Sequence, residues 1–254
     1  MMATRDTVTL DLWLTLIVDV PTTSTRSAKR DVLRIEQMTA AMAAAGYPVT
    51  EEQIRDAFAG ARADIDHAHR NGVDRTFELW IRQVVDHMHP RLFDQLPGED
   101  ADRIIAAADE PFIQSPPTVH EYALNLLKYL NDKGLKVALI SNTGFTSAKM
   151  YRRWFTELGW LEYFDVTTFS NEACVAKPTG SIFQMTLDEL HRGPANAIHV
   201  GDQLHSDVMG ANRVGMSTVW IKGYDNSDAP VAPDYAIDDL TELPAIIDRW
   251  SASG

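Results

Sequence analysis

The stretch that decides the fold lies near the start of the chain, where Thr7–Leu16 reads TVTLDLWLTL. Its first six residues, Thr7–Leu12, are β-branched or apolar except for one acid, Asp11. A short run of this kind is typical of a strand that is buried on both faces of a parallel sheet. Acids interrupt the wider apolar run Val8–Val20, so we interpret it as a strand and a loop rather than a signal peptide.

From Ser24 to Asp109 the chain carries helical patterns and no strand pattern. Apolar residues recur at helical spacing in four successive stretches, Val32–Ala45, Ile54–Ile65, Phe77–Met88 and Ala101–Ala108. Thr50 and Gln53 have the spacing of a capping box at the start of the second stretch. Four helices without a strand predict a small bundle of their own, and we place this domain at residues 21–110.

Strands and helices alternate over the rest of the chain. The predicted strands are Lys136–Ile140, Asp165–Phe169, Ala197–Val200 and Ser217–Ile221, with helical patterns between them. This alternation predicts an α/β fold, a doubly wound parallel sheet of Rossmann-like type with helices on both faces. The core domain comprises residues 1–20 and 111–254, and the helical bundle is inserted as a cap after the first strand. We interpret the acid-rich segment Tyr224–Asp248 as a solvated surface.

The composition excludes several classes of protein. The 254 residues include 23 Lys and Arg against 36 Asp and Glu, and the net charge of −13 disfavours nucleic acid or an anionic membrane as a partner. No apolar run of about 18 residues predicts a membrane span. The single cysteine, Cys174, suits a reducing cytoplasm and excludes an intramolecular disulfide. We expect a cytoplasmic protein with a small anionic substrate, and a homodimer stays open.

Polar side chains gather at the predicted carboxyl ends of the strands, where ligands bind in open α/β sheets. They are Asp11 and Thr15 after the first strand, Ser141, Asn142 and Thr143 after the second, Lys177 before Pro178, and Asp202 and Asp207 after Ala197–Val200. Carboxylates that converge without His or Cys favour a hard cation such as Mg²⁺. A strand-end carboxylate can also act as a nucleophile, and a lysine with hydroxyl donors suits phosphoryl transfer.

In this order the motifs resemble those of the haloacid dehalogenase-like (HAD) hydrolase superfamily. They are Asp11-x-x-x-Thr15-Leu16, Ser141-Asn142, Lys177-Pro178 and Gly201-Asp202-x-x-x-x-Asp207. The resemblance covers nearly the whole chain and implies that the helical insert is a type-1 cap, which closes over the site and chooses the substrate.

The resemblance also implies a role for each site residue. Asp11 would be the nucleophile, and Thr15 and Ser141 would orient the substrate anion. Lys177 would steady Asp11 and that anion. The expected Mg²⁺ ligands are Asp11, the backbone carbonyl of Trp13, Asp202 and Asp207. The expected substrate contacts are Trp13, Asn142 and Thr143.

The chain departs from the family pattern immediately after the nucleophile. Most family phosphatases carry a second aspartate two residues later, which protonates the leaving group and activates water, and here that position is Trp13. An indole is a donor only, so it cannot replace that acid. Leu14 likewise replaces the usual glycine. The 2-haloacid dehalogenases usually have tyrosine at the Trp13 position, because halide leaves without a proton.

Three functions therefore stay open. The spacing of Asp202 and Asp207 favours a magnesium-dependent small-molecule phosphatase with an aspartyl-phosphate intermediate, acting on a phosphate ester or acyl phosphate. The alternatives are a 2-haloacid dehalogenase-type hydrolase with an aspartyl-ester intermediate, and a weakened enzyme that serves as a binding protein.

Other residues with reactive side chains receive structural interpretations. We interpret His67 and His69 on a cap helix as solvated, with the alternative that they reach the site and supply a replacement acid. His205 lies between the two acids of the last motif, and the alternative for it is that it approaches the site. Cys174 and His199 are interpreted as packing residues.

Overall fold

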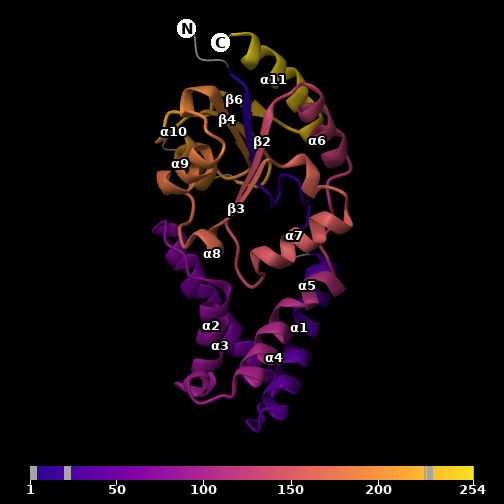
Figure 1. The fold of residues 1–254 in the computed structure, drawn as a ribbon, viewed down its shortest axis with the longest axis vertical. Helices are drawn as coiled ribbons and strands as arrows, with labels where there is room; N and C mark the ends of the chain where they lie inside the picture. The colour runs from indigo at the N-terminus through magenta and orange to yellow at the C-terminus, as the bar shows by residue number, and fades with distance from the viewer. Residues whose placement is uncertain (1–4, 20–23, 226, 228–230, 254) are drawn as a thin grey trace.

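The computed structural model of the chain describes residues 5–19, 24–225, 227 and 231–253. Figure 1 shows an α/β part that contains the sheet and both termini, and a helical part below it. The strands are β1 (Thr7–Leu10), β2 (Lys136–Ser141), β3 (Val166–Phe169), β4 (Ala197–Gly201), β5 (Ser217–Ile221) and β6 (Tyr235–Ile237). The helices are α1 (Thr25–Ala44), α2 (Glu51–Arg70), α3 (Phe77–Met88), α4 (Gly98–Asp109), α5 (Pro111–Gln114), α6 (Ala123–Asp132), α7 (Ala148–Glu157), α8 (Ser170–Ala173), α9 (Gly180–Glu189), α10 (Gly210–Asn212) and α11 (Leu243–Ala252).

The described strands form one six-stranded parallel sheet with the order β3-β2-β1-β4-β5-β6, which confirms the predicted fold class. β1 is central: Leu10 pairs with Leu139 of β2 on one side and with Val200 of β4 on the other. All four residues of β1 are buried, as the TVTL run predicts. The strand ends at Leu10 rather than Leu12, so Asp11 is the first residue beyond it.

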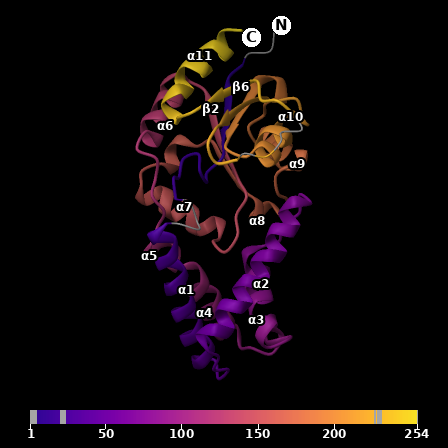
Figure 2. The ribbon, with the colours of Figure 1, turned by 180° about the vertical axis from the view of Figure 1, so that it is seen from behind.

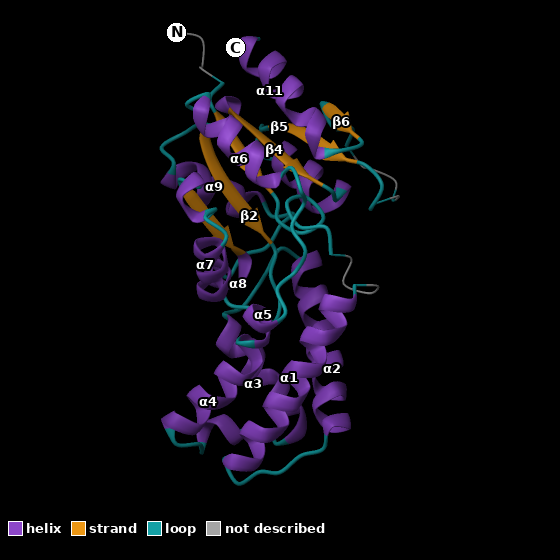
Figure 3. Ribbon diagram, turned by 90° about the vertical axis from the view of Figure 1, so that its right-hand side faces the viewer, coloured by secondary structure: helices purple, strands orange, loops and turns teal. Residues whose placement is uncertain are grey.

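Helices cover both faces of the sheet, as the alternating pattern predicts (Figures 2 and 3). One face packs against α6, α7 and α11, and the other packs against α9 and α10. The interpretation of Tyr224–Asp248 as a solvated surface is wrong, because the segment contains β6 and the first part of α11. Ile237, Leu243 and Ile247 are buried in the main core. The exposed acids Asp234, Asp238, Asp239 and Glu242 flank these two elements, and their number concealed the short apolar stretches between them.

The inserted helices have a separate apolar core. α1 packs against α4 and α2 packs against α3, and Met38, Met42 and Trp80 are buried between them, as predicted. The capping box at Thr50 and Gln53 is confirmed by hydrogen bonds in both directions. Val32 is an error in the predicted apolar stripe, because 48% of it is exposed. The domain limits of 21–110 stay a prediction, and the limit at residues 20 and 21 lies outside the described residues.

Backbone hydrogen bonds tie the insert to the α/β part beyond its two ends. After α2, Val73 forms an antiparallel bridge with Val175, and the Ala176 N–H donates to the Gly72 carbonyl at 3.1 Å. On the other side, buried Arg34 of α1 donates to the Phe145 carbonyl at 2.8 Å. The turn after α2 is therefore bonded to Val175 and Ala176, the two residues that precede Lys177 in the chain. Among the described helices, none is long and apolar enough to cross a membrane.

Candidate active site

The site lies where the parallel strands end, and Lys177 is at its centre. The Lys177 ammonium contacts a carboxylate oxygen of Asp11 and lies 2.6 Å from Asp207 Oδ1. Asp11 is placed by the end of β1, where its N–H donates to the Val200 carbonyl at 2.8 Å. All three side chains are buried, so each charge depends on its partners. The structure thus brings together three residues that are far apart in the sequence.

Asp207 is held by three donors. Besides Lys177, it lies 3.2 Å from His199 Nε2, and its second oxygen accepts from the Gln203 N–H at 3.0 Å. Burial disfavours its charge, but Lys177 and His199 outweigh that cost and lower the pKa of Asp207 below its ordinary value. His199 is itself held at Nδ1 by Thr9 Oγ1, at 2.8 Å. It is therefore buried as expected, but it positions a site carboxylate as well as packing in the core.

The residues after β2 meet Lys177 through its backbone. The Asn142 amide donates to the Lys177 carbonyl at 2.9 Å, and its oxygen accepts the Lys177 N–H at 2.8 Å. Thr143 is buried, and its N–H donates to Ser170 Oγ at 2.8 Å. Asn142 and Thr143 are thus engaged by the protein, whereas Ser141 Oγ makes only a 3.3 Å contact with the adjacent Asn142 carbonyl.

Thr15 has a hydroxyl oxygen that is buried without a hydrogen-bond partner in the described part of the chain. A buried hydroxyl without a partner is unfavourable unless a ligand or a water satisfies it. Thr15 lines a cavity with Leu14, His120 and Lys222, and it is not among the residues that line the cavity beside Lys177.

Asp202 is the carboxylate of the site that has no cationic partner among the described residues. Ligand oxygens of Asp11, Asp202 and Asp207 lie within 4.8 Å of one another. Lys177 supplies one positive charge, and Asp202 forms no ion pair with any described residue. Burial, followed by repulsion from Asp207 and Asp11, raises the pKa of Asp202 to about 9. Burial likewise raises the pKa of Asp11 to about 7, against the opposing effect of Lys177.

These residues fit a divalent cation. Three carboxylates with a single lysine leave negative charge that a hard cation would neutralise, and oxygen donors without sulfur or free imidazole suit Mg²⁺. Asp202 is the ligand with the fewest protein partners, while Asp207 is already held by Lys177 and His199.

The Trp13 side chain does not take over the role of the missing aspartate, because it is engaged by other residues of the protein. Its indole N–H donates to the Tyr151 hydroxyl at 3.1 Å, and the Arg30 guanidinium lies 5.8 Å from its ring centre. Arg30 comes from α1 and Tyr151 from α7, so this cluster joins the loop after β1 to the insert and to the core. No sequence pattern indicates these two contacts, because they link residues that are distant along the chain.

A cavity of about 260 Å³ opens beside Lys177 and includes residues of the insert. It is lined by Asp66, His69, Arg70, Asn142, Lys177, Pro178, Gln203, His205 and Ser206. His69 and His205 therefore meet at the site, which is the alternative interpretation of both residues. Cys174 was wrongly interpreted as a packing residue, because it is exposed.

His69 is paired with a buried carboxylate. Its Nε2 lies 2.8 Å from Asp74 Oδ2, and the Asp74 side chain is fully buried. Asp74 Oδ1 accepts from Trp80 Nε1 at 2.6 Å and from the Arg75 N–H at 2.7 Å. The sequence shows both residues, but the turn after α2 brings them together.

The fold and the site define an α/β enzyme with a carboxylate centre at the end of its central strand. The haloacid dehalogenase-like hydrolase family matches residues 6–215, and the chain belongs to this family. The family match confirms the resemblance drawn from the four motifs, and the helical insertion between β1 and β2 is consistent with a type-1 cap.

Curated relatives include phosphatases. The chain is 31% identical over 180 residues to a glyceraldehyde 3-phosphate phosphatase of Methanopyrus kandleri, covering 68% of this chain and 71% of the relative. It is 30% identical over 230 residues to haloacid dehalogenase-like hydrolase domain-containing protein 3 of Mus musculus, covering 86% and 88%. A ribulose-1,5-bisphosphate 5-phosphatase of Halopiger xanaduensis is 32% identical over 136 residues. This match covers 49% of the present chain and only 55% of the length of that relative.

Solved structures share the fold. A 2-haloacid dehalogenase from Pseudomonas syringae pv. Tomato superposes with a TM-score of 0.66 at 21% identity, over 96% of this chain and 99% of that one. The putative HAD-hydrolase YfnB from Bacillus subtilis, described as bound to magnesium, has a TM-score of 0.60 at 16% identity, with coverage of 96% and 99%. At these identities the likeness supports the fold alone.

Proposed function

We propose that the protein is a magnesium-dependent phosphatase of small molecules that uses Asp11 as its nucleophile. The observation that carries this proposal is the buried set at the carboxyl end of the sheet, in which Lys177 bridges Asp11 and Asp207 and Asp202 supplies unneutralised charge. A site of this charge balance suits a cation and a phosphoryl group together. The similarity to the Methanopyrus phosphatase supports a small phosphorylated substrate.

In the first step an Asp11 carboxylate oxygen attacks phosphorus. The bond from phosphorus to the leaving oxygen breaks, and the phosphoryl group remains on Asp11. Mg²⁺, held by Asp11, Asp202, Asp207 and the Trp13 carbonyl, would supply neutralisation of the phosphoryl charge. Lys177 holds the nucleophile in place and favours its ionised form, and the Thr15 and Ser141 hydroxyls donate to phosphoryl oxygens. In the second step water attacks phosphorus, and Asp11 is released with inorganic phosphate.

Both steps need a proton transfer that Trp13 cannot perform. The leaving oxygen must gain a proton, and the attacking water must lose one. His69 is the residue we assign to this transfer, since it lines the cavity beside Lys177 and Asp74 fixes its ring. A positioned acid or base contributes about 10²–10⁴ in rate. Substrates whose leaving group needs no proton, such as acyl phosphates, depend least on it.

The second candidate is hydrolysis of a 2-haloacid. Trp13 favours it, because an indole held between Arg30 and Tyr151 replaces the acid that a halide leaving group does not need. Asp11 would then attack the carbon that bears the halogen, halide would leave with the bonding electrons, and water would hydrolyse the ester. The unneutralised charge of Asp202 argues against this reaction, since it requires no metal.

One assay separates the two functions. Purified protein is incubated with acetyl phosphate, p-nitrophenyl phosphate and 2-chloropropionate, each with Mg²⁺ and with EDTA. We expect phosphate release that EDTA abolishes, with acetyl phosphate the fastest of the three. Halide release that is insensitive to EDTA would reject the phosphatase. If no substrate turns over, the weakened binding protein becomes the better description.

A further inference from the structure

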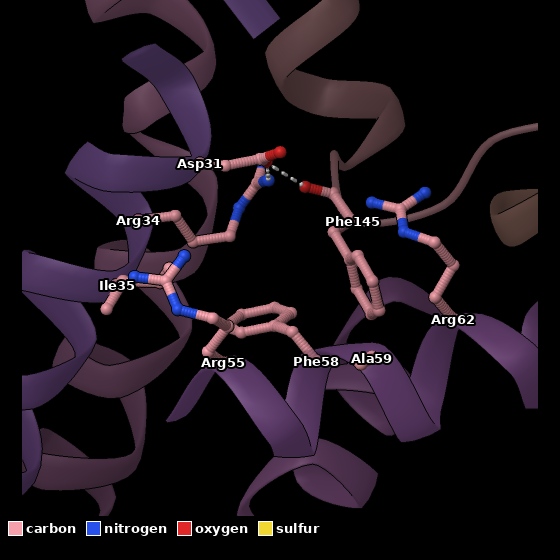
Figure 4. Close-up of a pocket in the computed structure, with 8 residues that line it drawn as sticks. All are labelled: Asp31, Arg34, Ile35, Arg55, Phe58, Ala59, Arg62 and Phe145. Atoms are coloured by element: carbon pink, nitrogen blue, oxygen red, sulfur yellow. Dashed lines mark hydrogen bonds and ion pairs between the residues drawn. The ribbon is translucent and has the colours of Figure 1, made fainter. Parts of the chain in front are cut away.

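A second cavity lies between α1 and α2 and shares no lining residue with the cavity beside Lys177. Its volume is about 220 Å³. Since a molecule of liquid water occupies about 30 Å³, it can hold an organic molecule of roughly seven to ten heavy atoms. Phe58 and Phe145 form an aromatic wall, with ring centres 4.8 Å apart and planes nearly perpendicular. Figure 4 shows three arginines, Arg34, Arg55 and Arg62, around these two rings.

Two of these arginines have no anionic partner within the described part of the chain. Arg55 and Arg62 form neither a hydrogen bond nor an ion pair there. Each has an acid four residues away on α2, Glu51 for Arg55 and Asp66 for Arg62, at a spacing where helical ion pairs form. The guanidinium of Arg62 instead lies 5.2 Å from the centre of the Phe145 ring. Their positive charge is therefore available to the cavity.

Arg55 and Arg62 lie on one face of α2. They are seven residues apart, which corresponds to about 10 Å along the helix axis. Phe58 occupies the same face between them. On the opposite wall, Arg34 is buried and its donors are used by Asp31 and by the Ala108 and Phe145 carbonyls. Arg34 is therefore not free to bind, and its pair with Asp31 at 3.1 Å cancels the charge of the one acid among the lining residues, so the net positive charge of the cavity comes from Arg55 and Arg62.

The positive charge is concentrated in a chain of net charge −13. Burial, together with nearby Arg30 and Arg62, lowers the pKa of Arg34 to about 10 despite the opposing effect of Asp31. Arg55 and Arg62 are exposed and form no ion pair with a described residue, so an anion that enters the cavity meets two available guanidiniums. A flat apolar body with an anionic group matches both features, since it can stack on the rings and pair with the guanidiniums.

We propose that this cap cavity is a second binding site, separate from the catalytic centre, for a small planar organic anion such as an aromatic carboxylate. The anionic group pairs with Arg55 or Arg62, which lie on opposite sides of the two rings (Figure 4), and the aromatic ring of the ligand lies against Phe58 and Phe145. Phe145 follows Ser141 by four residues, and its carbonyl is held by Arg34. Occupancy of the cavity is therefore linked to the loop that carries Ser141.

Calorimetric titration of the full chain with benzoate tests the proposal. The double variant Arg55→Gln/Arg62→Gln removes two charges from the cavity. The matched control, Arg82→Gln/Arg103→Gln, removes two from cap arginines that already pair on the surface with Asp94 and Asp100. We expect the first variant to bind benzoate at least tenfold more weakly, and the control to stay within twofold of the wild type. Benzyl alcohol, which lacks the charge, should not bind.

A second comparison separates the cavity from the catalytic centre. Benzoate binding should be equal with Mg²⁺ and with EDTA, and Ser141→Ala should leave it unchanged. Binding that requires Mg²⁺ or Ser141 would place benzoate at the catalytic centre and overturn the proposal. It would also be overturned if the wild type does not bind benzoate, or if both double variants bind it equally. None of these outcomes depends on phosphatase activity.

Discussion

The charged residues at the carboxyl edge of the sheet and those in the helical cap differ in burial and in pairing. At the sheet edge, Lys177 is buried between Asp11 and Asp207 and pairs with both. In the cap cavity, Arg55 and Arg62 are exposed and form no ion pair with a described residue, and Arg62 lies over the Phe145 ring. A buried charge needs a partner within the fold, whereas an exposed charge is stabilised by solvent and stays free to bind a ligand. The comparison contrasts a site whose charged residues hold one another in place with a cavity whose cations we propose to bind an anion.

The substitution Asp11→Asn should have the largest effect. An amide cannot act as the nucleophile, so we expect phosphate release to fall by roughly 10⁴-fold or more. The assay is release of phosphate from acetyl phosphate with Mg²⁺, and circular dichroism checks that the fold is kept. Asp56→Asn on the exposed face of α2 serves as the control and should retain most activity. Ordinary turnover by Asp11→Asn would show that another residue attacks the substrate.

His69→Gln should have the next largest effect, and its size should depend on the leaving group. We expect a loss of about 10²-fold or more with an alkyl phosphate, and a much smaller loss in phosphoryl transfer from acetyl phosphate. The ratio of the two losses is the measurement, because a structural defect would lower both rates together. Asp74→Asn should likewise slow the alkyl phosphate more than acetyl phosphate, since Asp74 orients the ring. Equal losses on both substrates would contradict the assignment of His69.

The contact between cap and core can be broken at Arg34. In Arg34→Met the apolar stem remains, but the buried Ala108 and Phe145 carbonyls lose their donor. We expect about 2–3 kcal/mol of destabilisation in urea unfolding. The control Arg103→Met, in an exposed pair with Asp100, should stay within about 0.5 kcal/mol of the wild type. A cap that unfolds separately would give two transitions.

The smallest expected effect is on the way the stability of the folded protein depends on pH. Without metal, the raised pKa values of Asp202, about 9, and Asp11, about 7, mean that the folded protein binds more protons than the unfolded chain above about pH 4. Stability should therefore fall as the pH rises from about 5 to about 8. Mg²⁺ displaces these protons, so its stabilising effect should grow over the same range.

Thermal unfolding with EDTA and with Mg²⁺ measures this difference. Asp202→Asn removes one of the two groups, so its metal-free form should lose less stability as the pH rises. It should also respond less to Mg²⁺. A metal-free wild type that becomes more stable toward pH 8 would contradict the excess negative charge assigned to the site.

Local patterns were sufficient for most elements of the fold. The TVTL run, the capping box of α2 and the alternation after Pro117 predict the parallel sheet and the inserted helices. The pattern was insufficient after Tyr224, where outward acids concealed β6 and the start of α11. It also placed Val32 in the cap core, although the side chain is exposed, since periodicity assigns a face only to within about one residue.

By itself, the sequence determined which chemical groups stand at the strand ends, because the strand-end residues of a parallel sheet must meet at one edge. It therefore predicted Asp11, Lys177, Asp202 and Asp207 as one set. Only the tertiary structure decided how these groups are partnered: His199 against Asp207, His69 against Asp74, and Trp13 between Arg30 and Tyr151. Such contacts join residues distant along the chain, and their distances depend on how the elements pack rather than on local periodicity.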